Sequence, residues 1–172
     1  KQKTAYEIPK RDWSSDVCSS DLAANLLGIL DSQKRPALRV YKLAVDSTVD
    51  LATAQRLAAL PGFSVAPGAH LTIADSADTL LSSANAAAVL SLAAIAGADI
   101  RVADTNQHLL DRASDIAVLS AAVVSLSTMM TDSAVGSVAR AIALTALRNF
   151  SIQSGQSLTV SDTAANILAP SV

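Results

Sequence analysis

Five aspartates, each followed directly by Ser or Thr, recur along this chain at nearly constant spacing. Their spacings in residue number are 29, 29, 28 and 30, and the five are Asp46, Asp75, Asp104, Asp132 and Asp162. An apolar-alternating stretch precedes each aspartate, and an Ala- and Leu-rich segment follows it. A fixed internal period is typical of architectures in which small units stack on one another, and here it predicts units of about 29 residues.

The two halves of each unit have different hydrophobic periods. Before the aspartate, apolar residues occupy alternate positions, which predicts a half-buried strand. After it, apolar residues recur at helical spacing within Ala-rich runs, and Ala has the highest intrinsic helix propensity. The residues four and two positions before the aspartates are the predicted core, namely Leu71, Ile73, Ile100, Val102, Leu158 and Val160.

The Asp-Ser or Asp-Thr pair lies where the predicted strand gives way to the helix. A side-chain oxygen at such a junction accepts a hydrogen bond from an unpaired amide of the first helical turn. We therefore expect Asp46, Asp75, Asp104, Asp132 and Asp162 to be structural helix caps. The first and fourth units break the pattern, the fourth with Thr128 and Met130 at strand positions, and local irregularity is expected there.

A unit of one strand, one turn and one helix is too small to bury its own apolar face. Stacking of such units predicts an α/β solenoid of about five coils with one parallel sheet, joined by right-handed crossovers and similar to leucine-rich repeats. The alternative fold is a compact, doubly wound α/β domain.

The segment Ser157–Leu168, SLTVSDTAANIL, resembles repeats of very large bacterial secreted and surface proteins. The stretches LTIADSADTLL and IRVADTNQHLL are similar to it but less regular. The resemblance implies a non-catalytic, adhesin-like repeat region of a type-I-secreted or cell-surface protein. It also implies that the coils stack on further repeats of their own chain.

Residues 1–22 differ from the rest of the sequence and contain the only Trp, Cys and Glu of the chain. The blocks KQKTAYEI and DWSSDVCSSDL resemble, in order and in frame, the translation of an Illumina-type sequencing adapter. Such segments are set aside before the fold is considered. We expect residues 1–22 to be non-native and residues 23–172 to be a fragment of the repeat region.

No motif of known chemistry accompanies the aspartates. Calcium takes 6–8 oxygen ligands, usually clustered near glycines, whereas this chain offers one aspartate per unit. His70 and His108 occupy different positions in their units, which does not favour a zinc site. Nucleophile-elbow, Walker and dinucleotide-binding patterns are missing from the sequence. We therefore expect no catalytic residue, cofactor or metal, and no enzyme.

Two other classes of protein are not favoured. A net charge of −2 without a basic run does not favour nucleic-acid binding. Residues 79–98 and 116–131 are uncharged, and the first run has the length of a membrane-spanning helix. Both runs contain much Ser, Thr and Ala and fall in the helical half of a unit, so burial between units explains them and no membrane insertion is expected.

A binding function would use the exposed strand face. Residues five, three and one positions before each aspartate point away from the predicted core. The alternative to a structural role is therefore a solenoid that binds a protein or glycan through this face. Its candidate residues are His70, Thr72, Asp99, Arg101, Met129 and Thr159.

Overall fold

The computed structural model describes residue 28 and residues 40–168. The expected adapter-derived segment, residues 1–22, lies outside this range. In chain order the elements are β1 (Lys42–Leu43), β2 (Ser47–Val49), α2 (Leu51–Ala58), β3 (Ser64–Val65), β4 (Leu71–Asp75), α3 (Ala77–Leu81), α4 (Ala86–Ala93), β5 (Ala98–Asp104), α5 (Asn106–Asp111), α6 (Ala113–Ala122), β6 (Leu126–Met130), β7 (Ala134–Gly136), α7 (Val138–Thr145), β8 (Phe150–Ile152), β9 (Leu158–Val160) and α8 (Ala164–Leu168).

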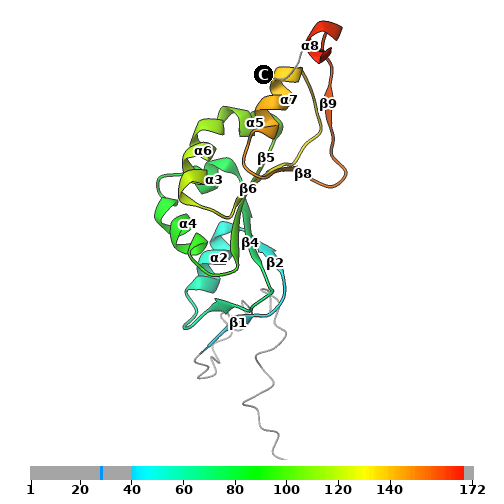
Figure 1. The fold of residues 1–172 in the computed structure, drawn as a ribbon. Helices are drawn as coiled ribbons and strands as arrows, with labels where there is room; N and C mark the ends of the chain where they lie inside the picture. The colour runs from blue at the N-terminus through cyan, green and yellow to red at the C-terminus, as the bar shows by residue number, and fades with distance from the viewer. Residues whose placement is uncertain (1–27, 29–39, 169–172) are drawn as a thin grey trace, which may run out of the picture.

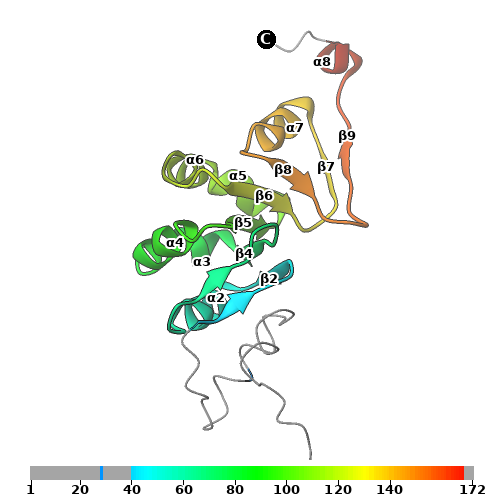
Figure 2. The ribbon, with the colours of Figure 1, turned by 60° about the horizontal axis from the view of Figure 1, so that its bottom comes forward.

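The chain has a mixed α/β fold in which all strands paired in the described range are parallel. The main sheet has five strands in the order β2-β4-β5-β6-β8, and β1-β3 and β7-β9 form two short sheets. The strand order follows the chain order, without the reversal that marks a doubly wound sheet. Figures 1 and 2 show helices α2 to α7 stacked along one side of the strands. We call each stretch from one strand of the five-stranded sheet to the next a strand–helix unit.

Strand β5 shows how the sequence produces one unit. Ala98, Ile100 and Val102 are buried, and the residues between them face outward with partial exposure. This alternation follows from the two-residue period of a strand. The strand ends at Asp104 because the next residue, Thr105, caps helix α5.

The core lies between the five-stranded sheet and the helices. Ile73, Ile100 and Leu126 are paired in register across β4, β5 and β6, and all three are fully buried. Buried helix side chains such as Leu109 and Ile116 belong to the same hydrophobic cluster. The predicted core positions on β4 and β5 are therefore confirmed.

The last strand differs from this prediction. Leu158 is only half-buried and Val160 is 42% exposed, so the expectation that Val160 fills the core is wrong. The reason is the position of β9 in its sheet. β9 pairs with β7 on one side, and no described strand pairs with its other side.

The register of the strands corrects the period expected from the aspartates. Residues that lie opposite each other differ in number by 27 between β4 and β5, as in Leu71 and Ala98, and by 22 between β6 and β8, as in Thr128 and Phe150. An aspartate such as Asp104 lies beside the first helical residue of the preceding unit, Ala77, and not beside the previous aspartate. The spacing of the aspartates therefore exceeds the length of a unit.

Irregularity was expected in the first and fourth units. In both, an aspartate lies between two strands, with Asp46 between β1 and β2 and Asp132 between β6 and β7. Strand β6 itself is regular, and Thr128 and Met130 are fully buried in it, so the irregularity expected at these two residues is not found. Short strands also precede β4 and β9, namely β3 and β8, whereas β5 is continuous over seven residues.

The two long uncharged runs do not form single helices. Residues 79–98 comprise the end of α3, helix α4 and the start of β5, and residues 116–131 contain most of α6 and all of β6. None of the helices in the described part of the chain has the length and apolar character needed to cross a membrane.

Candidate functional site

Hydroxyl side chains cap the helices that follow them directly. Ser76 Oγ accepts a hydrogen bond from the Thr79 amide (3.2 Å), and Thr105 Oγ1 accepts one from the His108 amide (3.4 Å). Ser137 and Thr163 do the same for α7 and α8. Helix α2 is capped by Asp50, whose Oδ1 accepts from the Thr53 amide at 2.7 Å. Asp50 was not among the expected caps, although its position directly before Leu51 could have indicated it.

The recurring aspartates were expected to cap the helices that follow them, but the structure shows that they bind the helix of the preceding unit. Asp75 Oδ2 accepts from the Leu51 amide (3.2 Å), and Asp104 Oδ2 accepts from the Ala77 amide (2.9 Å). Two further bonds of this kind join Asp132 Oδ1 to the Asn106 amide (2.7 Å) and Asp162 Oδ2 to the Val138 amide (3.1 Å). Each donor is the first residue of its helix. We call these four aspartates the aspartate ladder.

Three of the four ladder aspartates also stabilise the turn that directly follows them. One oxygen of Asp75, of Asp104 and of Asp162 accepts from the amide of the following residue, each at 2.8 Å. The two oxygens of one carboxylate thus join a strand end to a neighbouring helix start. A carboxylate near a helix N-terminus also interacts favourably with the helix dipole. The ladder therefore links adjacent units through amides that would otherwise lack partners.

Asp46 lies outside the ladder. Its Oδ1 accepts from the amide of His70, which precedes strand β4, at 2.8 Å. The expectation that Asp46 caps a helix is therefore wrong, because β2 separates it from α2. It still joins its own unit to the next one.

Hydrogen bonds lower the pKa of two carboxyls at helix starts. The pKa of Asp50 lies below its usual 3.8 because of hydrogen bonding to Thr53, first through the side chain and then through the amide. The pKa of Asp162 is lowered chiefly by the Asn166 side chain, and then by the amides of Thr163 and Val138. Both groups therefore favour the folded state in their ionised form.

We expect protonation of Asp50 to contribute to the loss of stability of the protein at acid pH. Because its folded pKa is depressed, its stabilisation is complete above 3.8 and is lost as the pH falls through the folded value. Asp50→Asn keeps an oxygen that can cap α2 but does not titrate. Urea unfolding at a series of pH values should show that the free energy of unfolding falls less steeply below about pH 4 in the variant than in the wild type. Identical slopes for both proteins would contradict this prediction.

His108 joins two units through a cluster of charged groups that the sequence analysis did not predict. Its Nδ1 lies 2.8 Å from Asp104 Oδ2, and its Nε2 lies 3.5 Å from Asp78 Oδ2. The Asp78 carboxylate also pairs with Arg112 at 3.2 Å. The i,i+4 spacing of Asp104 and His108 is a signal in the sequence, but the contact with Asp78 depends on how the units stack.

The exposed strand face brings together most of the candidate binding residues. Thr72 lies opposite Asp99, and Arg101 lies between Ala74 and Ser127. His70 Nδ1 is 3.1 Å from Asp99 Oδ2 at one end of this face, and Met129 lies on β6 opposite Ala103 and Ser151. Thr159 is separate, since β9 belongs to another sheet.

Arg101 differs from the other residues of this face. Its Nε is buried and has no hydrogen-bond partner, and no ion pair of Arg101 occurs, within residues 40–168. Ala74 and Ser127, which flank it in register, are both small. A guanidinium recognises planar carboxylates through paired hydrogen bonds. An anionic group is therefore the ligand that Arg101 is suited to bind.

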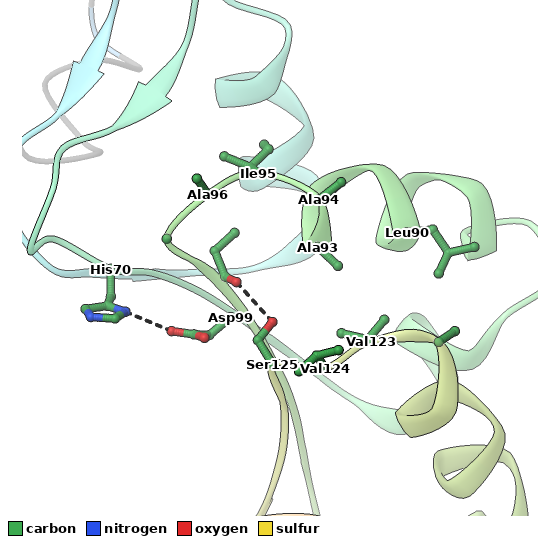
Figure 3. Close-up of a pocket in the computed structure, with 13 residues that line it drawn as sticks. His70, Leu90, Ala93, Ala94, Ile95, Ala96, Asp99, Val123, Val124 and Ser125 are labelled. Atoms are coloured by element: carbon green, nitrogen blue, oxygen red, sulfur yellow. Dashed lines mark hydrogen bonds and ion pairs between the residues drawn. The ribbon is translucent and has the colours of Figure 1, made fainter.

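A cleft of about 560 Å³ opens beside the His70–Asp99 pair. Figure 3 shows Leu90 and Ala93 of α4 on one wall, with Val123 and Val124, which follow α6, on the other. Its remaining lining consists of four alanines with Ile95, Gly97 and Ser125. The lining offers van der Waals contact and few polar groups that could orient a ligand.

The described residues contain no group of three or more His, Cys, Asp or Glu side chains placed to hold a metal ion. The imidazole of His70 contacts a carboxylate, and in residues 40–168 it makes no hydrogen bond to a hydroxyl or thiol. Comparison of the chain with models of known protein families, with curated proteins and with solved structures gives no match.

Proposed function

We propose that this chain is a non-catalytic structural segment of a larger solenoid, in which strand–helix units stack to form a spacer that displays other domains. The observation that carries the proposal is the aspartate ladder. Its four carboxylates each join one unit to the helix of the unit before it, with partners that differ in residue number by 24 to 27. Such nearest-neighbour contacts are how stacked units stabilise one another.

The composition of the exposed strand face supports a passive role. Its residues are mainly Thr, Ser and Ala, whereas binding hot spots are enriched in Trp, Tyr and Arg. Several titratable groups are used in structural contacts, as with Asp104 and His108. The resemblance of Ser157–Leu168 to bacterial repeats favours an exported, adhesin-like parent at the cell surface or in the medium.

The experiment that tests this role is to sequence the source locus with adapters removed and to read the continuous frame. We expect residues 1–22 to disappear and further strand–helix units to flank residues 23–172. An export signal in the same frame would support the proposed location. A frame that retains residues 1–22 and contains no further unit would overturn the proposal.

The second candidate function is recognition of an acidic ligand by the strand face. It is favoured by Arg101, the one arginine among the candidate residues, which makes no ion pair within residues 40–168. Screening the protein against acidic and neutral glycans separates the two roles. The structural role predicts no binding above background. Binding of acidic glycans that Arg101→Ala abolishes, and that the matched variant Arg148→Ala keeps, would establish the second function instead.

A further inference from the structure

The two long uncharged runs of the sequence, residues 79–98 and 116–131, are only partly buried in the structure. Leu90 of α4 is 46% exposed, Val118 of α6 is 73% exposed, and Val124, which follows α6, is 81% exposed. Burial between units therefore accounts for only part of these runs. Large exposed apolar surfaces are typical of sites where proteins bind other molecules.

The exposed apolar residues line a groove between α4 and α6. One part of the groove is the 560 Å³ cleft beside the His70–Asp99 pair, which Val124 lines. The other part, of about 360 Å³, is lined by Val118 and by further residues of α3, α4 and α6. Leu90 and Ala122 line both parts, so the two adjoin. We call them together the α4–α6 groove.

The groove lies in the middle of the stack. Strand β5 follows α4 and strand β6 follows α6, whereas β2 and β8 are the outer strands of the five-stranded sheet in the described chain. Further units would stack beyond these outer strands and not over the groove. The spacer role therefore leaves the groove uncovered.

The groove fits one face of a helix better than a small molecule. A small-molecule site usually encloses most of the surface of its ligand. Here Leu90, Val118 and Val124 are themselves exposed, so a molecule lying on them would remain open to water on its other side. An amphipathic helix suits such a surface, because it buries an apolar face in a groove and keeps its polar face in water.

The charged groups at the two ends of the groove favour a basic helix. At the start of α6, Arg112 already pairs with Asp78 at 3.2 Å and with Asp115 at 3.0 Å. Figure 3 shows the His70–Asp99 pair at the end of the cleft away from Leu90. Asp99 makes no other ion pair within residues 40–168. A Lys or Arg side chain could therefore pair with Asp99, whereas an acidic helix would face aspartates at both ends.

We propose that the α4–α6 groove binds a basic amphipathic helix of a partner protein. The apolar face of that helix packs on Leu90, Val118 and Val124, and a Lys or Arg of the helix lies near Asp99. The charges contribute mainly to the choice of partner, and the apolar contacts contribute most of the affinity. This inference goes beyond the proposed spacer role, since it assigns a binding surface to the helix side of the stack.

The experiment is fluorescence anisotropy of a labelled probe peptide titrated with the full chain. The probe has Leu at helical spacing on one face and Lys on the other. A second probe has the same composition in a scrambled order that forms no apolar face. We expect saturable binding of the ordered probe and at least about tenfold weaker binding of the scrambled one. An ordered probe with Glu in place of Lys should also bind more weakly, because aspartates flank the groove.

Protein variants locate the binding site. Val118→Ser combined with Val124→Ser removes apolar contact and should raise the dissociation constant of the ordered Lys probe at least about tenfold. Asp99→Asn should raise it for the Lys probe and not for the Glu probe. The matched control is Val135→Ser on β7, which is 72% exposed and lies outside the groove, and it should leave the constant unchanged. Circular dichroism of every variant confirms that the fold is retained.

Each other outcome overturns the inference. Equal binding of the ordered and scrambled Lys probes would show charge attraction alone, and the absence of saturable binding would show that the groove does not accept a helix. An unchanged dissociation constant in the Val118/Val124 variant places the contact elsewhere. Binding of phosphatidylcholine vesicles in place of the probe would assign the groove to a lipid surface. None of these results depends on the flanking sequence that tests the spacer role.

Discussion

Replacing Ile100 with alanine is expected to lower the free energy of unfolding by about 2–5 kcal/mol. Ile100 is 0% exposed on the central strand β5, and its register partners Ile73 and Leu126 are buried on either side. The substitution removes apolar contacts and leaves a cavity that neighbours on three strands cannot readily fill. Urea unfolding followed by circular dichroism measures the change.

The control for this prediction is Val118→Ala on α6. Val118 is 73% exposed, so shortening it should change the unfolding free energy by no more than about 0.5 kcal/mol. An unfolding midpoint for Ile100→Ala that equals the wild-type value would contradict the assignment of β5 to the core.

The second large effect is expected for Asp104→Ala, with a loss of about 2–3 kcal/mol. The Asp104 carboxylate accepts hydrogen bonds from the amides of Thr105 and Ala77, and it contacts His108 Nδ1 at 2.8 Å. Its side chain is only 12% exposed, so water replaces these bonds poorly. The loss should appear as a lower free energy of unfolding in urea at neutral pH.

Two variants make this test specific. Asp104→Asn keeps one acceptor oxygen and should lose less stability than Asp104→Ala. Asp111→Ala removes a nearby exposed carboxylate that accepts a bond from the Gln107 side chain, and it should cost no more than about 0.5 kcal/mol. Equal losses for Asp104→Ala and Asp111→Ala would show that the ladder does not link units energetically.

The local features of this protein could be predicted from its sequence. The alternation around Leu71, Ile73, Ile100 and Val102 predicted strands and their buried faces, since strand period is a property of neighbouring residues. The Asp-Ser and Asp-Thr pairs indicated the starts of α3, α5 and α8 for a similar reason, although the hydroxyl and not the aspartate of each pair is the cap. A capping bond spans only three positions, as between Ser76 and Thr79. Alternation of strand and helix was enough to predict the α/β class.

Which groups meet between units could not be predicted from the sequence, because it depends on how the units stack. The aspartates recur at spacings of 28 to 30, but strand partners differ in residue number by 22 to 27. Asp104 consequently reaches back to Ala77 in addition to its own turn, and His108 meets Asp78. Val160 has the sequence of a core residue yet is exposed, because burial requires a neighbouring strand as well as an apolar side chain. Register and stacking depend on contacts between residues that are distant in the sequence. A local pattern does not encode the partner against which a residue packs.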